Sequence, residues 1–189
     1  MTTYNNIHNH MDSNGLLKEG LESLASGRFN EAYELLSTLI TDDANATTAL
    51  AARGRALLGL QRFTQACRDF AKATATGRLD ADSWFAYGLC LKKTGEFAQS
   101  VECYDQVLAI DPLRTDAWFN RGNALGKSGL FDEALESYRR VLAIDPKDAG
   151  AHANTGYALE QMGKKDEAHA WYRKAIAIEP AMARTLKTS

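Results

Sequence analysis

The sequence has few cysteines and no long apolar run. Its 189 residues include three cysteines, Cys67, Cys90 and Cys103. The number of cysteines is odd, and no two of them form a Cys-x-x-Cys pair. Neither a disulfide framework nor a thiolate zinc site is therefore indicated. No stretch of roughly 18 apolar residues occurs, and the start, MTTYNNIHNHMD, lacks the basic cluster and apolar run of a targeting signal. We therefore expect a soluble, cytoplasmic protein that does not insert into a membrane.

An excess of one charge sign is also missing. The chain has 22 Lys and Arg against 24 Asp and Glu, which gives a formal net charge of −2. Binding to duplex nucleic acid rests on a concentrated positive field, so we do not expect a nucleic-acid partner. The charges are mixed and 45% of the residues are hydrophobic, which argues against disorder and is enough for a continuous core.

Motifs for catalysis and cofactor binding are absent as well. The sequence contains no G-x-x-x-x-G-K-[ST], G-x-G-x-x-G, G-x-S-x-G or H-E-x-x-H. We expect no enzyme activity, no cofactor and no metal. His8 and His10 alternate in a polar, Asn-rich arm, a pattern that favours disorder over metal binding. His152 is interpreted as a packing residue, and Cys90 and Cys103 as buried small residues.

What the sequence does contain is an internal repeat. GYALEQMGKKDEAHAWYRKAIAIEP (156–180) aligns with GNALGKSGLFDEALESYRRVLAIDP (122–146) at a shift of 34 residues. Extending this register backwards predicts five units, at 13–46, 47–80, 81–114, 115–148 and 149–182. A polar arm, 1–12, precedes them and a short tail, 183–189, follows; we expect the arm to be flexible.

Each unit has the apolar spacing of two helices. Positions 4, 7, 8 and 11 of a unit, and then 20, 24, 27 and 28, follow the i, i+3, i+4, i+7 pattern of an amphipathic helix. A glycine inside a helix is unfavourable, so the one at position 8 of every unit predicts a close helix approach, with the small residue at position 20 as its partner. The position-8 glycines are Gly20, Gly54, Gly88, Gly122 and Gly156. Gly27, Gly95, Gly129 and Gly163 mark the turns between paired helices.

These residues resemble the tetratricopeptide repeat. Position 20 is Ala32, Ala66, Ser100, Ala134 and Ala168, position 24 is Leu36, Phe70, Tyr104, Tyr138 and Tyr172, and position 32 is Pro112, Pro146 and Pro180 in the last three units. Position 7, usually leucine in the family, is Glu19, Arg53, Tyr87, Arg121 and Thr155. The resemblance implies an all-α, right-handed superhelical α-solenoid of five helix-turn-helix units, with ten helices. It also implies a non-enzymatic protein that binds a protein or peptide partner in a concave groove.

The groove of such a solenoid is lined by the first-helix positions opposite the core stripe. Cations outnumber anions among these positions, so we expect an extended, acidic or C-terminal peptide segment as the ligand. Aromatic and leucine side chains in the groove would supply much of the binding affinity by burying apolar area. The lysines would contribute less to affinity and more to the choice of partner. The alternatives are that the lysines form a solvated face and that the rings pack against the neighbouring unit. The candidate groove residues are Arg55, Phe85, Leu89, Lys92, Lys93, Phe119, Asn120, Asn123, Lys127, Asn154 and Tyr157.

Asn123 and Asn154 occupy position 9 of one unit and position 6 of the next. In tetratricopeptide domains that clamp a C-terminal carboxylate, asparagines take these two positions, and a lysine takes position 5, where this chain has Phe119. Three interpretations stay open: a carboxylate clamp, recognition of the main chain of an extended peptide by Asn120, Asn123 and Asn154, and a merely solvated set of amides.

The ends of the array suggest a second function. Only AMARTLKTS follows Pro180, which is too short for a stable capping helix, and the first unit has an unusually apolar stripe. The alternative is therefore a self-assembling structural scaffold, a homo-oligomer that associates through terminal repeats. The residues for this contact are Leu17, Leu21, Trp171 and Met182, and the front arm could instead lie in a neighbour's groove.

Overall fold

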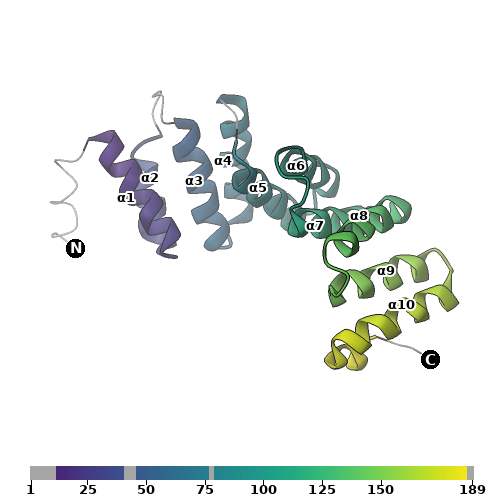
Figure 1. Cartoon of the computed structure of the whole chain (residues 1–189). Coiled ribbons are helices and arrows are strands. Elements are labelled where there is room, and N and C mark those ends of the chain that lie inside the picture. The colour runs from purple at the N-terminus through teal and green to yellow at the C-terminus, as the bar shows by residue number, and fades with distance from the viewer. Residues whose placement is uncertain (1–11, 41–45, 77–78, 187–189) are drawn as a thin grey trace. The chain divides into compact units, whose positions relative to one another are not determined.

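The computed structural model describes residues 12–40, 46–76 and 79–186. These residues form ten α-helices and one 3-10 helix, without a strand (Figure 1). The predicted all-α fold is confirmed. Apart from Asp12, the front arm lies outside the described residues, as do the last three residues of the tail. The helices are α1 (Ser13–Ala25), α2 (Phe29–Ser37), α3 (Ala46–Gly59), α4 (Phe63–Thr76), α5 (Ala81–Thr94), α6 (Phe97–Ile110), α7 (Thr115–Lys127), α8 (Phe131–Ile144), α9 (Ala149–Gln161), α10 (Lys165–Ile178) and η3 (Pro180–Arg184).

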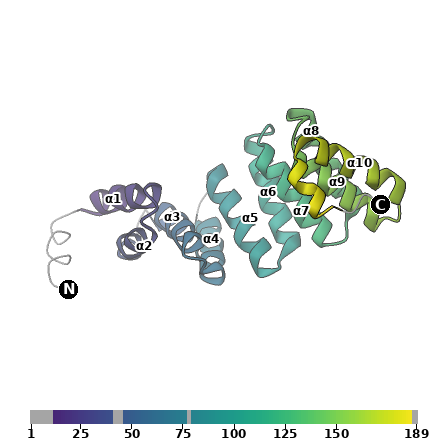
Figure 2. The same ribbon diagram turned by 90° about the horizontal axis from the view of Figure 1, so that it is seen from below.

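The chain divides into two compact units, Met1–Thr94 and Gly95–Ser189. In the first unit, α1 packs against α2 and α3 against α4, and the first helices α1, α3 and α5 contact one another in turn (Figure 2). Leu36 and Phe70 are fully buried between these helices. The core of this unit therefore lies between a row of first helices and the second helices packed on it.

The second unit repeats the same construction. The pairs α7 with α8 and α9 with α10 pack together, and α7 also contacts α9. Their cores centre on Tyr138 with Leu125 and on Tyr172 with Leu159. Ten helices with this pairing fit five helix-turn-helix units, as the 34-residue shift predicts.

The position-8 glycines make room for the side chain at position 24. A Cβ atom added to Gly122 would lie 2.6 Å from the ring of Tyr138, and one added to Gly156 would lie 2.6 Å from the ring of Tyr172. We expected the small residue at position 20 to be the partner of each glycine. Ala168 does contribute, because its carbonyl would lie 3.1 Å from the added Cβ at Gly156, but the large ring of position 24 is the nearer group.

The turns between paired helices are made by the predicted glycines. Gly27, Gly95, Gly129 and Gly163 all have positive φ, between 73° and 94°. This left-handed conformation is unfavourable for residues with a side chain. The backbone N–H after each of three such glycines bonds back into the first helix, for instance from Leu130 to the carbonyl of Leu125 at 3.0 Å. The predicted turns are confirmed.

In the fourth and fifth repeats, a ring nitrogen bonds to the carbonyl of the proline in the preceding repeat. The Trp118 indole nitrogen donates to the carbonyl of Pro112 at 2.9 Å, and His152 Nε2 lies 3.0 Å from the carbonyl of Pro146. Both rings occupy position 4 of their units. His152 is buried, in agreement with its interpretation as a packing residue, and its ring nitrogen serves the same contact as the tryptophan.

Arginine at position 7 replaces the usual leucine with a polar bridge. Arg53 donates to the carboxylate of Asp69 through Nε at 2.7 Å and Nη2 at 2.8 Å, and to the Ser37 hydroxyl at 3.2 Å. Arg121 donates to Asp105 at 2.7 Å and to the Ser137 hydroxyl at 2.8 Å. Each partner is 16 residues away in the sequence, one on either side. The guanidinium therefore joins the second helix of its own repeat to that of the preceding repeat.

The tail covers part of the last helix pair. Residues Pro180–Arg184 form the short helix η3, and Leu186 then packs against the cluster of Leu159, Ala168 and Tyr172. The segment is too short to be stable alone. It nevertheless covers apolar surface that would otherwise be exposed at this end.

Candidate peptide-binding surface

Three side chains from three helices meet in the second unit. Asn154 on α9 donates its Nδ2 to the Asn123 Oδ1 atom on α7 at 2.8 Å. The Tyr138 hydroxyl on α8 donates to the same oxygen at 2.9 Å. One amide oxygen thus accepts two hydrogen bonds, and the two asparagines selected from the sequence point toward each other.

The repeat explains why these residues meet. First helices of consecutive repeats are neighbours, so side chains 31 residues apart can touch across the α7–α9 contact. Tyr138 reaches them because its ring passes over Gly122, where no side chain intervenes. Tyr138 is only 4% exposed, and this burial raises the pKa of its hydroxyl, while a hydrogen bond with Asn154 acts in the opposite direction.

The network leaves part of each asparagine unused. Within the described residues, the Asn123 Nδ2 and the Asn154 Oδ1 have no hydrogen-bond partner. Both side chains are half-buried. Asn120 differs, since its Nδ2 donates to the Asp116 carbonyl of its own helix at 2.8 Å. The N–H groups of Asn123 Nδ2 are therefore donors beside an acceptor, Asn154 Oδ1. Such a set matches the carbonyl oxygen and the N–H group of a peptide main chain.

The two aromatic candidates in this unit have different environments. Phe119 is half-buried, with its ring centroid 6.1 Å from that of Tyr138, and its ring atoms lie close to Gly150 of α9. Much of this ring is used for packing between repeats, as one of the sequence interpretations held. Tyr157 is 50% exposed and has more surface to offer a ligand.

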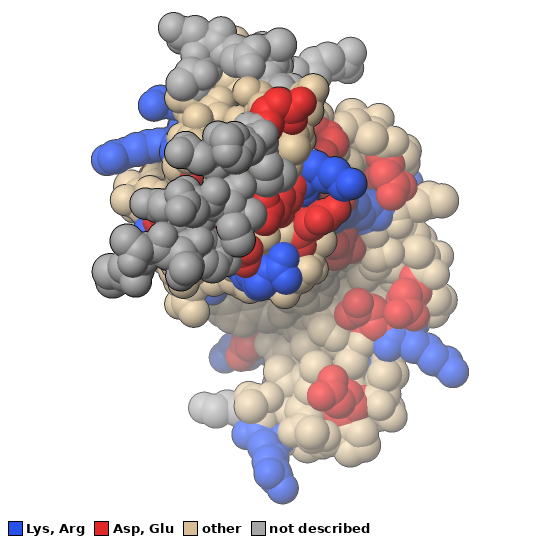
Figure 3. Space-filling view, turned by 90° about the vertical axis from the view of Figure 1, so that its left-hand side faces the viewer, with Lys and Arg blue, Asp and Glu red and all other residues tan. Residues whose placement is uncertain are grey.

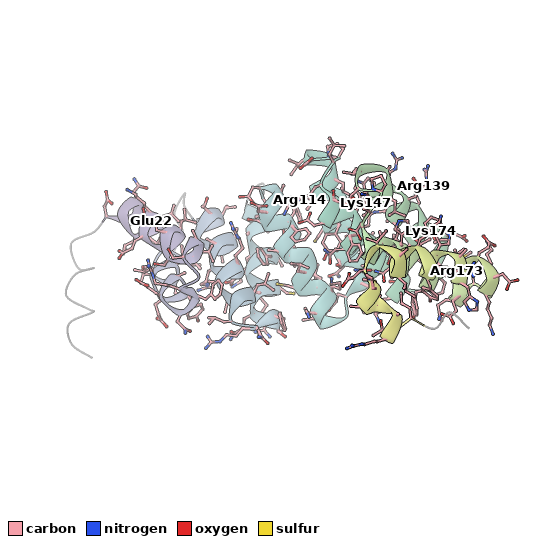
Figure 4. All side chains as sticks on the ribbon, turned by 60° about the horizontal axis from the view of Figure 1, so that its bottom comes forward. Glu22, Arg114, Arg139, Lys147, Arg173 and Lys174 are labelled. Atoms are coloured by element: carbon pink, nitrogen blue, oxygen red, sulfur yellow. The ribbon has the colours of Figure 1, made fainter. Side chains whose placement is uncertain are left out.

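Positive charge is not concentrated along the first helices of the second unit. Lys127 is exposed at the end of α7. In Figure 4, Arg139 projects from α8, and Arg173 and Lys174 from α10, which are second helices. On the face drawn in Figure 3, acidic and basic side chains are intermixed. Among the groove positions counted from the sequence, Lys127 on α7 is balanced in this unit by Glu160 on α9, so the expected basic excess is not found here.

The remaining groove candidates belong to the first unit, which we describe by itself. Phe85 and Leu89 on α5 are half-buried, and Lys93 is exposed. Lys92 is half-buried, and burial together with the charge of Lys93 lowers the pKa of its amine.

A small hollow lies on the first helices of this unit. It has a volume of about 90 Å³, with Ala51 and Ala52 at its wall, Leu21 on α1 and Arg55 on α3. Arg55 has no hydrogen-bond or ion-pair partner among the described residues. The sequence interpretation selected Arg55 as a groove residue but did not select the two alanines beside it.

The residues selected for self-association lie in two places. Leu17 and Leu21 line an open hollow of about 400 Å³ on the outer face of α1, together with Asn14, Lys18, Glu22 and Ala25. At the other end, Trp171 is half-buried, 5.4 Å from the His152 ring, with the Lys174 amine 4.1 Å above it. Met182 is half-buried in η3.

The described residues contain neither a metal-binding cluster nor a membrane-spanning helix. They contain no group of three or more His, Cys, Asp or Glu side chains arranged to hold a metal ion. Within the same residues, every helix is too short or too polar to cross a membrane.

Comparisons with known proteins establish the class to which this fold belongs. Family models described as tetratricopeptide repeat match residues 115–148 and 149–181, and one described as TPR repeat matches 88–129. The chain is a tetratricopeptide repeat protein, with an all-α solenoid fold. A search of curated proteins gives no match.

Solved structures give the same fold. "Crystal structure of YrrB: a TPR protein with an unusual peptide-binding site" has a TM-score of 0.85, at 23% identity over 95% of each chain. "MamA MSR-1 C2" has a TM-score of 0.82, at 22% identity, covering 89% of this chain and 97% of that one. "Crystal structure of MamA protein" has a TM-score of 0.80, at 20% identity, covering 93% and 96%.

Proposed function

We propose that this chain is a non-enzymatic adaptor that binds an extended peptide segment of another protein on its first helices. Asn123 and Asn154 contact the main chain of that segment, and Tyr157 packs against its side chains. The contact between the two asparagines carries the proposal, because it sets donors and an acceptor side by side on neighbouring repeats. The sequence has three cysteines and no Cys-x-x-Cys pair, a pattern that favours a reducing compartment, so the proposal places this function in the cytoplasm.

The composition of the surface favours a segment from inside a chain over a free C-terminus. Binding of a free carboxylate requires a cation beside the amides. Position 5 of this repeat, where carboxylate-clamping domains have a lysine, holds Phe119, whose ring packs against Tyr138. Lys127 is exposed at the end of the same helix and favours an acidic residue elsewhere in the segment. The description of the similar YrrB structure as having a peptide-binding site agrees with this class of ligand.

Selection from a library of random twelve-residue peptides tests the proposal. Peptides enriched on the wild-type protein are synthesised with free and with amidated C-termini, and their affinities are measured by fluorescence anisotropy. We expect equal affinity for both forms and about tenfold weaker binding to Asn154→Ala, which loses two or more hydrogen bonds. Asn30→Ala, an exposed asparagine on α2, is the matched control. A library that yields no binder, or binders indifferent to Asn154→Ala, contradicts the proposal.

A second function, a self-assembling scaffold, is favoured by one observation. The outer face of α1 carries the open hollow around Leu17 and Leu21, and Leu21 is 37% exposed. An apolar surface at the end of a repeat array is suited to contact with another copy. Light scattering after size exclusion tests this: Leu21→Lys should reduce the measured mass, whereas Leu113→Lys, the same change at a 72% exposed site, should not. A wild-type monomer at high concentration would rule out this function.

A further inference from the structure

We propose that Arg55 and the hollow beside it form a subsite for one acidic side chain, an aspartate or a glutamate, of a bound protein segment. This inference rests on the proposed peptide-binding function and names the chemistry of one group of the ligand. It concerns only the first compact unit, Met1–Thr94, in which the first helices α1, α3 and α5 contact one another in turn.

Arg55 occupies the same position of its repeat as Asn123 does two repeats later. The Asn123 Oδ1 atom accepts a hydrogen bond from Asn154, on the first helix of the next repeat, at 2.8 Å. It accepts a second one, at 2.9 Å, from the Tyr138 hydroxyl on the second helix of its own repeat. A polar side chain at this position can therefore be held by two groups, one on each neighbouring helix.

The first unit lacks both groups around Arg55. Ala86 stands where the later repeat has Asn154, and its buried methyl group forms no hydrogen bond. Phe70 stands where the later repeat has Tyr138; its ring lies 2.9 Å from a Cβ atom added to Gly54, but it carries no hydroxyl. Accordingly, Arg55 has no hydrogen-bond or ion-pair partner among the described residues.

The neighbouring arginine shows a contrasting environment. Arg53, two residues earlier on α3, donates to Asp69 and to Ser37 and so joins helices of the array. Arg55 is half-buried like Arg53 but has no such partner in the described part of the chain. A half-buried charge without a partner has lost part of its hydration, so an anion that bonds to Arg55 gains more than it would at an exposed arginine.

The hollow has the size and lining for a side chain. Its volume is about 90 Å³, whereas one water molecule needs about 10–15 Å³ of such space, so it has room for a group of several atoms. Leu21, Ala51 and Ala52 contribute apolar surface to its wall, and Arg55 contributes the cation. An aspartate or glutamate matches this order, with methylene groups against the apolar wall and the carboxylate on the guanidinium.

An acid on the wall limits the charge of the ligand. Asp80 also lines the hollow, and its Oδ1 atom accepts the backbone N–H of Ser83 in the first turn of α5 at 2.6 Å. The amino end of α5 offsets part of this negative charge. What remains disfavours a doubly charged group such as phosphate, while one guanidinium matches one carboxylate through two parallel hydrogen bonds. The lining therefore favours a singly charged carboxylate side chain.

The first experiment uses a probe that needs no identified partner. The blocked tripeptide acetyl-Ala-Glu-Ala-amide is titrated into the ¹⁵N-labelled full chain, and the Nε–H signal of Arg55 is followed by NMR. This signal is identified by its loss in Arg55→Gln, which should keep the wild-type melting temperature because Arg55 bonds to no described group. We expect the signal to shift and to saturate at peptide concentrations on the order of millimolar.

Three controls make this titration decisive. Acetyl-Ala-Gln-Ala-amide has the same shape without the charge and should leave the Arg55 signal in place. The Nε–H signal of Arg68, an exposed arginine on α4, should not respond to either tripeptide. Inorganic phosphate should bind more weakly than the glutamate tripeptide. An unmoved Arg55 signal, equal shifts at Arg55 and Arg68, or tighter binding of phosphate would overturn the inference.

The second experiment selects ligands that depend on Arg55. The random twelve-residue library is first depleted on immobilised Arg55→Gln protein and then selected on wild type, and we expect aspartate or glutamate to be enriched at one peptide position. Replacing that acid by its amide should raise Kd for wild type by about tenfold and leave Kd for Arg55→Gln unchanged. Asp80→Asn keeps an acceptor for Ser83 and removes a like charge, so it should lower Kd by about twofold to fivefold.

The outcomes separate this subsite from the proposed function. The subsite is overturned if no peptide remains after depletion, if no acid is enriched, or if the change from acid to amide acts equally on wild type and Arg55→Gln. Peptides that need Arg55 but bind Asn154→Ala as tightly as wild type would support the subsite and contradict the role proposed for the asparagines.

Discussion

Arg53 and Asp69 form a bidentate ion pair between the two helices of one repeat, with the aspartate only 4% exposed. The pair raises the pKa of the Arg53 guanidinium, chiefly through its hydrogen bonds to the carboxylate. It stands where the family usually has an apolar contact. Its energetic behaviour should therefore differ from that of a surface salt bridge.

Removing one partner of this pair should destabilise the protein strongly. Asp69→Ala leaves the half-buried guanidinium without its carboxylate, and we expect a loss of about 3 kcal/mol in the free energy of unfolding. Urea denaturation measures this loss. Glu136→Gln is the control, because Glu136 pairs with Arg139 and Arg140 at the surface, and its removal should leave the urea midpoint nearly unchanged. Equal effects of the two variants would show that the Arg53 pair behaves as a surface pair.

The glycines of α7 make a matched test of close packing. Gly122→Ala places a methyl group 2.6 Å from the Tyr138 ring and should cost about 1–3 kcal/mol of unfolding free energy. Gly126→Ala meets nothing closer than the Tyr138 hydroxyl at 4.0 Å, and should raise stability by up to about 1 kcal/mol through helix propensity. Opposite signs in thermal or urea unfolding are expected. A neutral Gly122→Ala would mean that the ring can move aside at no cost.

Stability should fall at alkaline pH because of the buried tyrosines. Burial raises the pKa of Tyr138 above its ordinary value of 10.0, so above pH 10 the unfolded chain releases a proton that the folded protein retains. The folded state then loses up to about 1.4 kcal/mol per pH unit relative to the unfolded state. Urea unfolding at pH 9 and pH 11 should show a shallower decline for Tyr138→Phe than for wild type. Identical pH slopes would contradict this assignment.

The role of the groove lysines in partner binding can be tested separately from the role of the terminal repeats in self-association. Changing Lys92, Lys93 and Lys127 to Glu should reduce capture of an acidic partner, because like charges repel, and should leave the mass in light scattering unchanged. The measurement is affinity capture followed by mass spectrometry, with the Arg139→Glu, Arg173→Glu and Lys174→Glu variant as an equal charge change on second helices. Recovery of the same partners by wild type and by the first variant would remove these lysines from the site.

Much of the fold could be predicted from the sequence, because the repeat shows the same local signal several times. The apolar spacing gave the helix pairs, and the glycines with positive φ gave the turns. The contact between Asn123 and Asn154 also followed from the spacing of first helices. These features depend on local conformation and on a regular stack, and both can be recognised in the amino-acid pattern.

Other features could not be predicted, because they depend on which side chains come together in three dimensions, and the helical spacing of apolar residues does not specify this. The Arg121 guanidinium found its partners 16 residues away in both directions, on two different helices. The Tyr138 hydroxyl reached across to the asparagines from a position that we interpreted only as core. A buried ring with a polar end is a usable signal, since its hydroxyl must find a partner.

The arginine bridge bears on how arrays of this kind change length. Arg53 takes its carboxylate from its own repeat and a hydroxyl from the repeat before, whereas Arg121 does the reverse. The joint therefore requires one acid and one hydroxyl but is indifferent to which side supplies which. A duplicated or transplanted repeat that carries this arginine therefore fits behind a neighbour whose second helix supplies the missing group, which is a hydroxyl for the repeat of Arg53 and an acid for the repeat of Arg121. The order in which repeats can be added to such an array is then set by this pairing.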